Sequence, residues 1–382
     1  MNILMTVTNP YSNDPRVRRE AEALAEAGHE VRVIAWDRNG RLSPMETISG
    51  VEVFRISNSL FMKMLPFDSM RLPLWRARAV LIASRYFAPC DVIHCHDFDS
   101  LPIGIELKKR LKKPLIYDIH EIYGYMVSKD LPWWKRYIEM EKRLVQEVDM
   151  MITVCEPLQK YYDKFFNNEN YPDECWKPIY LVKNCKEFDG LPYQPPTAEP
   201  FVVIYAGTIG ESREILELID AVGRMNPPIR FIIAGSGKKK YVKAVIEHSS
   251  RTSNVWYSGS VPQAEVARLT KRCHAGVCLL GKGTESNKMA LPNKLFESMV
   301  AGRPLFTTRG LHYSDVADRL GFGIPVSNID EFVTELKSLA SDPERCERLG
   351  RKALEAASDY NWENEKKKLL EVYSHLNYIT LY

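Results

Sequence analysis

The strongest constraint on this chain is an alternation of short β-rich runs with amphipathic helical runs, which occurs twice along the sequence. In the first half, residues 2–7 have the composition of a strand, and a helix is expected to begin at Asp14-Pro15 and to end before Gly28. The alternation restarts at residue 201. Such alternation predicts parallel sheets with helices on both faces. The sequence therefore predicts an α/β protein of two Rossmann-like, doubly wound domains that face each other across a cleft.

A proline-rich stretch separates the two halves. Residues 189–200 contain four prolines, which prevent regular helix or strand. We expect an interdomain linker at residues 191–200, with one domain at residues 1–190, a second at residues 201–360 and a final helix at residues 361–382. Ligands bind at the carboxyl ends of strands in such folds, so the candidate site residues are those that follow strands.

Composition narrows the class of protein. The chain has 382 residues and a net charge of only +3, which excludes a dedicated nucleic-acid binder. No apolar run reaches the roughly 18 residues of a membrane-spanning helix, and the N-terminus lacks the basic region of a secretory signal. The eight cysteines are scattered without a C-x-x-C pair, which indicates free thiols in a reducing compartment. We therefore expect a cytoplasmic protein.

Loops of the first half carry candidate binding residues. The loop with Asn9 and Tyr11 leads to a helix N-terminus, whose free amides favour an anion or a sugar hydroxyl, although a plain connector fits equally well. His94 and His96 share one face of a strand, as a metal pair would, but no third Cys or His lies nearby in the sequence, so we expect no metal there. Asp97 begins a D-x-D triplet, which either holds a divalent cation or simply starts a helix that lines the cleft.

His120 ends the next strand, within the run Tyr117–Glu121. Ionisable groups at the end of a buried strand cost free energy unless they are solvated or used. Near neutral pH a histidine can donate a proton to a substrate hydroxyl or to a leaving oxygen. The alternative is a structural histidine whose hydrogen bonds are satisfied within the protein.

In the second half, glycine-containing loops follow two strands. Gly207 and Gly210 let the backbone approach a ligand closely, and Arg213 near the next helix start is placed to clamp a phosphate. Gly235 begins a G-x-G that lacks the third glycine of a dinucleotide-binding loop. An oxidoreductase is therefore disfavoured.

The stretch 285–302 is the richest in candidate binding groups. Pro292 ends a polar loop, and we expect Asn293 to be the N-cap of a helix. Glu297 is not explained by a capping box, which would need its acid one residue earlier. Its carboxylate can accept two hydroxyls, as ribose recognition requires, and Lys294 with the free amides of the helix start can face a diphosphate.

Together these segments resemble the retaining family-4 (group 1) glycosyltransferases of the GT-B fold over nearly the whole chain. The resemblance rests on DPRVRREAEALAEAGHEV at 14–31, DVIHCHD at 91–97, YDIHE at 117–121, YAGT at 205–208, AGSG at 234–237 and LPNKLFESMVAGRP at 291–304. Each segment alone is a modest signal, and their combination in this order is specific.

The resemblance implies a nucleotide-diphosphate sugar donor bound mainly by the second domain and an acceptor bound by the first. It maps the ribose-binding glutamate to Glu297, the diphosphate-binding cation to Arg213 with Lys294 beside it, and the histidine that contacts the donor sugar to His120. The loop around Asn9 would lie under the acceptor and the phosphates. The final helix would pack back on the first domain.

The resemblance also implies retention of anomeric configuration through a same-face displacement. In that reaction the leaving diphosphate, stabilised by cations, helps to deprotonate the acceptor hydroxyl. A double displacement would need a carboxylate nucleophile, which is not evident in the sequence, and no metal or other cofactor is expected. The first acid of the family's E-x7-E pattern falls on Met289, and Glu285 or Asn287 is a candidate substitute.

The acceptor is suggested by residues 60–67 and 70–78, which combine large apolar side chains with basic ones. Such a surface predicts peripheral contact with the inner face of the cell membrane and a lipid-linked acceptor, with an ordinary core helix as the alternative. Residues 133–136 have the same character. We expect a hexosyltransferase that acts on a glycan or lipid-linked hydroxyl in cell-surface polysaccharide or glycolipid synthesis.

Two other functions fit the same residues. A two-domain UDP-sugar 2-epimerase shares the overall shape and needs no acceptor. A non-catalytic nucleotide-sugar binding protein would accommodate the Met289 replacement. Acceptor-dependent release of nucleoside diphosphate distinguishes the transferase from both.

Overall fold

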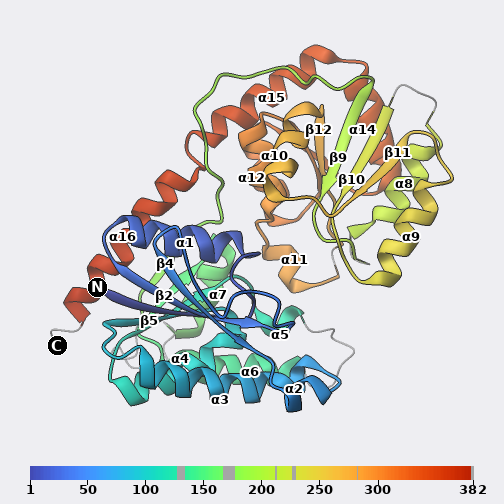
Figure 1. Cartoon of the computed structure of the whole chain (residues 1–382). Helices are drawn as coiled ribbons and strands as arrows, with labels where there is room; N and C mark the ends of the chain where they lie inside the picture. The colour runs from blue at the N-terminus through green and yellow to red at the C-terminus, as the bar shows by residue number, and fades with distance from the viewer. Residues whose placement is uncertain (127–133, 167–176, 211–212, 226–228, 282, 380–382) are drawn as a thin grey trace. The chain divides into compact units, whose positions relative to one another are not determined.

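The computed structural model describes residues 1–126, 134–166, 177–210, 213–225, 229–281 and 283–379. The chain divides into two compact units (Figure 1). The first comprises Met1–Lys183 with Lys366–Tyr382, and the second comprises Asn184–Glu365. The chain thus leaves the first unit before the proline-rich segment expected as the linker, and that segment belongs to the second unit.

The first unit is built on an eight-stranded sheet. In spatial order its strands are β3 (Met45–Ile48), β4 (Val51–Ser57), β2 (Glu30–Asp37), β1 (Asn2–Val7), β5 (Val92–His96), β6 (Leu115–Ile119), β7 (Met150–Thr153) and β8 (Ile179–Leu181). All neighbours pair in parallel except β3 with β4. The short edge strands β3 and β8 are additions to what the sequence pattern predicts.

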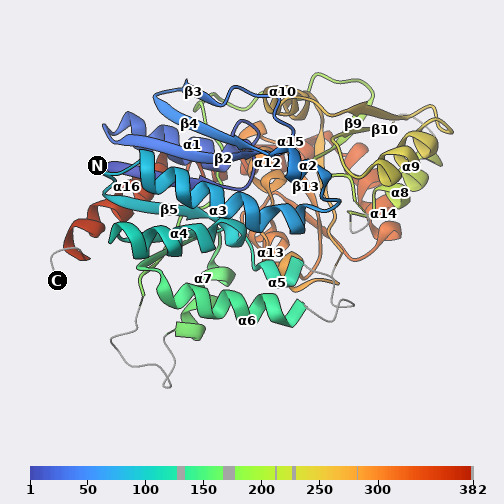
Figure 2. The same cartoon turned by 60° about the horizontal axis from the view of Figure 1, so that its bottom comes forward.

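Helices cover both faces of this sheet. They are α1 (Pro15–Glu26), α2 (Leu60–Met64), α3 (Asp68–Tyr86), α4 (Asp97–Leu111), α5 (Tyr123–Met126), α6 (Trp134–Leu144), α7 (Glu156–Phe166) and α16 (Trp362–Ile379). Figures 1 and 2 show α3, α4 and α6 side by side on one face, with α1 and α16 on the other. A doubly wound α/β domain is therefore confirmed.

The first helix shows why these residues fold locally. The Asp14 carboxylate accepts a hydrogen bond from the Val17 amide at 3.2 Å, and Pro15 occupies the first turn. Gly28 follows the helix with φ of 86°, a conformation that favours glycine. Val17 and Leu24 are buried against the sheet, as the helical periodicity predicts.

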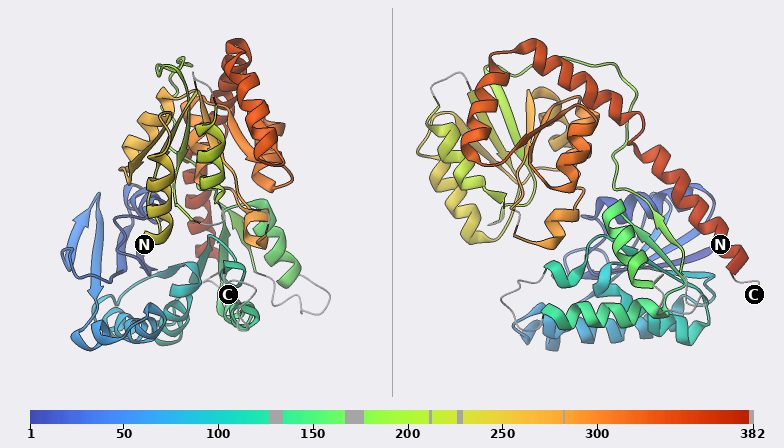
Figure 3. Two further views of the ribbon diagram at one scale, coloured as in Figure 1. Left: turned by 90° about the vertical axis from the view of Figure 1, so that its right-hand side faces the viewer. Right: turned by 180° about the vertical axis from the view of Figure 1, so that it is seen from behind.

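The final helix, α16, packs on the first unit. Lys366 Nζ lies 2.5 Å from a carboxylate oxygen of Glu26 on α1, and the Tyr373 hydroxyl lies 2.7 Å from His94 Nδ1 on β5. Tyr180 on β8 and His375 are hydrogen-bonded at 2.8 Å. The view from behind in Figure 3 shows the red helix along the blue strands. The predicted return of the final helix to the first domain is confirmed.

The second unit has a parallel six-stranded sheet. Its strands, in spatial order, are β11 (Val255–Gly259), β10 (Ile229–Ala234), β9 (Phe201–Ala206), β12 (Ala275–Cys278), β13 (Leu305–Thr308) and β14 (Gly323–Val326). Its helices are α8 (Ile215–Gly223), α9 (Lys239–Ser249), α10 (Gln263–Arg272), α11 (Glu285–Met289), α12 (Asn293–Ala301), α13 (His312–Arg319), α14 (Ile329–Ala340) and α15 (Pro343–Ala357). Helices α8 and α9 cover one face, and α10 and α12 cover the other (Figure 1).

None of the helices in the described part of the chain has both the length and the apolar character needed to cross a membrane. The seven cysteines that the structure describes are buried and carry free thiols, as predicted, while Cys175 lies outside the described residues.

Candidate active site

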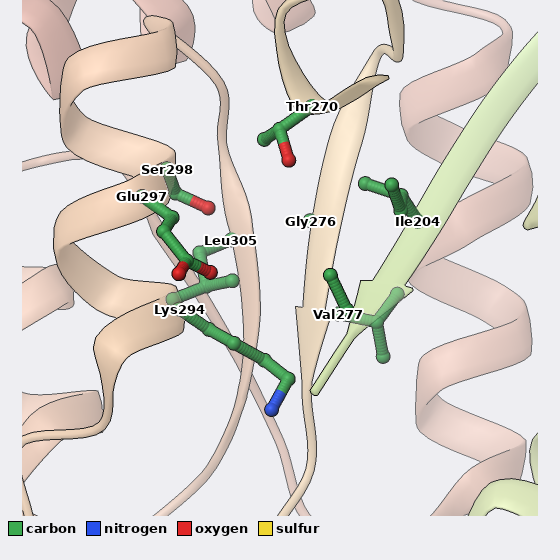
Figure 4. Close-up of a pocket in the computed structure, with 9 residues that line it drawn as sticks. Ile204, Thr270, Gly276, Val277, Lys294, Glu297, Ser298 and Leu305 are labelled. Carbon is green, nitrogen blue, oxygen red and sulfur yellow. The ribbon is translucent and has the colours of Figure 1, made fainter. Parts of the chain in front are cut away.

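A pocket in the second unit lies between helix α12 and the strands β9 and β12 (Figure 4). Gly276 allows this helix to approach the sheet, because a Cβ atom there would lie 2.7 Å from Ser298 Oγ. The pocket is lined by Ile204, Ala206, Thr270, Gly276, Val277, Lys294, Glu297, Ser298 and Leu305. It therefore contains two of the charged residues that the sequence singles out, Lys294 and Glu297.

Glu297 is buried, with 9% of its surface exposed, and two neighbouring side chains hold its carboxylate in place. Its Oε1 accepts a hydrogen bond from Gln263 Nε2 at 2.9 Å and lies 3.5 Å from Lys186 Nζ. Among the described residues, none donates a hydrogen bond to Oε2. The carboxylate is thus charge-compensated on one oxygen and retains acceptor capacity on the other.

Asn293 is not the N-cap of α12, contrary to the prediction. The N-cap is Pro292, and no side chain caps this helix end. Instead, Asn293 Oδ1 accepts hydrogen bonds from Asn184 Nδ2 at 2.9 Å and from Lys186 Nζ at 3.4 Å. The side chain turns toward the segment after β8, where two donors compete with the helix amides for its oxygen. Lys186 therefore links Asn293 to Glu297.

Sequence reasoning missed three residues of this site: Asn184, Lys186 and Gln263. The first two follow the three-residue strand β8, which has no clear pattern of its own. Gln263 starts α10, a helix that the sequence analysis did not identify. Their polar side chains reach Glu297 and Asn293 only through the tertiary fold.

The two glycine-containing loops pack backbone against backbone. The Gly207 amide donates to the Ala234 carbonyl at 2.8 Å. A Cβ atom at position 235 would lie 1.8 Å from the Gly207 carbonyl oxygen, and Gly235 has φ of 155°. Gly235 is thus required by the loop packing itself. At Gly210, by contrast, a Cβ atom would meet no described atom within 4 Å, so its backbone is accessible.

Lys294 extends from α12 to the end of β9. Its Nζ lies 4.4 Å from the ring centroid of Tyr205, and a Cβ atom at Gly207 would lie 2.7 Å from that nitrogen. Burial raises the pKa of the Cys278 thiol, and the positive charges of Lys294 and Arg213 act in the opposite direction. Both cations are therefore close enough to the end of β12 to act on one buried group.

Arg213 lies close to the accessible Gly210, and its backbone amide donates a hydrogen bond to the Gly210 carbonyl at 3.3 Å. The sequence places Arg213 near a helix start, and α8 begins at Ile215. Glu214 has φ of 51°, which is not a helical conformation and delays the helix start. Arg213 consequently lies just before α8 rather than in its first turn.

In the first unit, the ends of β5 and β6 meet helix α1 at Asp118. This buried carboxylate accepts two hydrogen bonds from Arg16, at 2.7 and 2.9 Å, and also lies 2.7 Å from His120 Nε2 and 3.1 Å from His96 Nδ1. Burial opposes its ionisation, but Arg16 and His120 outweigh burial and hold the pKa of Asp118 well below its usual value. Asp118 is thus an ionised anchor for His120.

His120 lies between two carboxylates. Its Nδ1 is 3.0 Å from Asp97 Oδ2, and its Nε2 bonds to Asp118. Burial lowers the pKa of His120, but Asp97 and Asp118 outweigh it and raise that pKa well above the usual value. The ring is therefore an imidazolium that donates both N–H groups to protein. Direct contact of the ring with a donor sugar would require exchange of one of these bonds.

The D-x-D acids have separate partners. Asp97 starts α4 with φ of 60° and pairs with His120, while Asp99 lies 3.7 Å from Arg76. The helix-start interpretation of this triplet is confirmed by α4 itself. Asp97 is 40% exposed at its side chain, so it remains accessible from solvent.

The loop of Asn9 and Tyr11 is held by its own side chains. Asn9 Oδ1 accepts from the Tyr11 amide at 2.8 Å, and its Nδ2 donates to Asp14 at 2.7 Å. Tyr11 is fully buried, with φ of 69°. The structure therefore gives both residues a role in loop conformation.

Comparisons with known proteins agree with this architecture. Residues 16–171 match the family model described as Glycosyltransferase Family 4, and residues 193–356 match that described as Glycosyl transferases group 1. An uncharacterized glycosyltransferase of Methanocaldococcus jannaschii is 26% identical over 376 residues, which span 92% of this chain and 91% of that protein.

Solved structures share the fold. The sucrose-phosphate synthase of Thermosynechococcus elongatus aligns with a TM-score of 0.80 and 17% identity, over 99% of this chain and 100% of that chain. Anabaena HepE in complex with UDP-glucose aligns with a TM-score of 0.72 and 15% identity, over 98% and 99%. A trehalose-phosphate synthase of Burkholderia xenovorans, in complex with glucose-6-phosphate, aligns with a TM-score of 0.70 and 12% identity, over 99% and 100%. The chain therefore belongs to the group 1 glycosyltransferases, with a family 4 N-terminal domain and the GT-B fold.

Proposed function

We propose that the second unit binds a nucleotide-diphosphate sugar beside this pocket, at Glu297 and Lys294, and that the enzyme transfers the sugar to a hydroxyl with retention of configuration. The observation that carries this proposal is the buried, oriented carboxylate of Glu297 one helical turn from Lys294 on α12. The free Oε2 of Glu297 supplies an acceptor for ribose hydroxyls. HepE is described in complexes with UDP and UDP-glucose, so UDP-sugars are the first donors to test.

The diphosphate is assigned to the loop after β9. Lys294 lies against Gly207, Arg213 follows Gly210, and the backbone around Gly210 is accessible. Cations and amides placed there stabilise the charge that develops on the departing diphosphate. Among the described residues that line the pocket, Glu297 is the only acid. It is already engaged by Lys186 and Gln263, which favours same-face displacement over a carboxylate nucleophile. We propose that this chemistry needs no metal ion.

The acceptor assignment draws on the surface of α2 and α3. Large apolar side chains there are exposed, with Leu60 at 82% and Met64 at 73%, and basic side chains lie among them. The apolar and basic patch comprises the exposed Leu60, Phe61, Lys63, Met64, Phe67 and Met70, with the half-buried Arg71, paired with Asp68, beside them. The following part of α3, with Trp75 and Ala79, is core, as is Met62 of α2. Trp133, in the similar run of residues 133–136, lies outside the described residues.

Such a patch supports contact with an anionic membrane surface and a lipid-linked acceptor, as in glycolipid or cell-surface polysaccharide synthesis. Flotation with anionic vesicles tests it. We expect the wild type and Trp256→Asp, altered at an exposed apolar residue of the second unit, to float, and Leu60→Asp/Met64→Asp to remain at the bottom. Equal behaviour of all three would contradict the membrane proposal and favour a free glycan or sugar-phosphate acceptor.

Nucleotide binding is tested by thermal shift with UDP, GDP and ADP. We expect one of them to raise the thermal unfolding midpoint of the wild type and of Glu247→Ala, an exposed control on α9, but not of Glu297→Ala. An unchanged shift in Glu297→Ala would show that the ribose is placed wrongly.

Turnover with radiolabelled donors then distinguishes the transferase from the epimerase and from a binding protein. Diphosphate release that depends on an acceptor supports the transferase, an epimeric sugar without acceptor supports the epimerase, and binding without turnover supports a binding protein.

A further inference from the structure

Beneath the His120 network, the first unit contains a buried histidine cluster, defined here as Glu20, His94, His96 and Asp118. Glu20 comes from α1, the histidines from β5 and Asp118 from β6. Each side chain is at most 1% exposed. One potential metal-ligating atom from each residue lies within 4.8 Å of the others. Donor atoms around one tetrahedral Zn²⁺ lie roughly 3–4 Å apart, so small side-chain shifts would close this cluster on a single ion.

The two histidines have one nitrogen occupied and one nitrogen unused. His94 Nδ1 lies 2.7 Å from the Tyr373 hydroxyl, and His96 Nδ1 lies 3.1 Å from Asp118 Oδ2. Both Nε2 atoms are buried and have no hydrogen-bond partner among the described residues. A histidine that ligates a metal has this arrangement, with its second nitrogen bonded to a carboxylate or another oxygen. Buried polar atoms without partners otherwise carry a substantial cost.

Glu20 completes the set. Both of its carboxylate oxygens are buried without a hydrogen-bond partner in the described structure, and Oε2 lies 4.0 Å from His94 Nε2. Arg16 forms an ion pair with Glu20 Oε1 at 2.8 Å, while its hydrogen bonds go to Asp118 and to the Val182 carbonyl. Sequence reasoning rejected a metal at His94 and His96 because no third ligand was nearby in the sequence. The fold brings that ligand from α1.

We propose that Nε2 of His94, Nε2 of His96 and a carboxylate oxygen of Glu20 bind one divalent transition-metal ion, with Zn²⁺ as the best-fitting class. Two imidazoles and one carboxylate form a common zinc ligand set, and Asp118 acts behind it as the partner of His96. The site joins α1 to β5 and, through Tyr373, to α16, so its role is structural. It is separate from the diphosphate pocket of the second unit and does not rest on the proposed function.

The test measures metal content. The full chain is produced in medium supplied with Zn²⁺, purified without chelators and examined by elemental mass spectrometry. We expect about one zinc ion per chain in the wild type. We expect the same content in His248→Asn, a control histidine of the second unit paired with Asp220, and loss in Glu20→Gln and His96→Asn. Metal-free, folded wild type would overturn the proposal, because a trapped water molecule would then satisfy the cluster. Equal zinc in all four proteins would overturn it as well.

A second measurement does not depend on the folding of the variants. X-ray absorption of the zinc-loaded wild type should show only nitrogen and oxygen neighbours, with the scattering of two imidazole rings. Chelation of the ion under mild denaturant should lower the thermal midpoint, and added Zn²⁺ should restore it. Sulfur neighbours would overturn the proposal, since they would place the ion on the cysteines of the chain.

Discussion

Lys186 Nζ lies 3.5 Å from Glu297 Oε1, and this pair joins the start of the second unit to the helix of its pocket. Both side chains are about 10% exposed, so each charge depends on the other. Lys186 also reaches Asn293 Oδ1, and its carbonyl accepts a hydrogen bond from the Trp362 amide at 2.8 Å. The lysine is thus anchored by its backbone while its side chain orients the carboxylate assigned to ribose.

Replacing Lys186 should disturb both stability and donor binding. We expect Lys186→Met to lower the free energy of unfolding by about 2 kcal/mol, because Glu297 is left buried without its cation. Weaker orientation of the carboxylate should raise the donor KM by about 10-fold, equivalent to ~1.4 kcal/mol. Denaturant unfolding and steady-state kinetics measure the two effects.

The control for this prediction is Lys288→Met, which removes an exposed ion pair with Glu285 on α11. It should change stability by less than about 0.5 kcal/mol. In the double variant Lys186→Met/Glu297→Gln, much of the lost stability should return, since no charge is left unpaired. A double variant less stable than Lys186→Met alone would show that the pair does not explain the loss.

Lys294 should matter for the rate more than for the fold. Its ammonium lies at the end of β9, where the diphosphate is assigned, and a cation there acts mainly on the charge that develops as the phosphate leaves. We expect Lys294→Met to reduce kcat by about 100-fold or more, with a thermal midpoint close to that of the wild type. Lys238→Met, at the exposed start of α9, should retain full kcat. A change in donor KM alone would assign Lys294 to ground-state binding instead.

Gly235 and Gly210 should respond differently to substitution, because Gly235 is needed for loop packing and Gly210 is proposed to face the donor. Gly235→Ala places a methyl group against the Gly207 carbonyl and forces a φ of 155°, so it should destabilise the fold by more than about 2 kcal/mol. Gly210→Ala meets no described atom and should leave stability within about 0.5 kcal/mol while weakening donor binding. Urea unfolding with and without nucleotide measures both. Equal stability of the two variants would contradict this distinction.

Much of the fold is predictable because its signals are local. Asp14, Pro15 and Gly28 mark α1 within one short segment, and the structure confirms each of them. Asn293 has the composition of an N-cap, but its oxygen is taken by Lys186, from a segment far away in the sequence. Local signals cannot show such competition, because only the tertiary fold brings the second donor close.

The candidate site shows the same division. Glu297 and Lys294 can be recognised as candidate site residues from the sequence, because neither has a role in forming or capping the helix that carries it. Glu20 has the opposite character: it lies within a helical run, where a glutamate is normally a solvated residue, and only the sheet topology turns it toward His94. Residues that act through partners on other elements are therefore the ones that the sequence does not indicate.

The raised pKa of the Glu141 carboxyl should make the free energy of unfolding depend on pH. This buried carboxyl on α6 accepts hydrogen bonds from the Tyr117 and Tyr162 hydroxyls at 2.9 and 2.7 Å. Burial raises its pKa from 4.5 to about 7, against the effect of these hydrogen bonds, and the charge of Asp97 adds to the rise. Between these two values the folded chain keeps a proton that the unfolded chain releases. Stability therefore falls as the pH rises through that window and levels off above it.

The expected loss is about 3 kcal/mol across the window, since each pKa unit corresponds to about 1.4 kcal/mol. Glu141→Gln keeps an oxygen that can accept from both tyrosines and has no charge to bury, so its stability should not fall over this range. Glu139→Gln, an exposed neighbour on the same helix, should keep the wild-type slope. Urea unfolding at closely spaced pH values from 4.5 to 8 measures all three. A slope unchanged in Glu141→Gln would assign the pH dependence to another group.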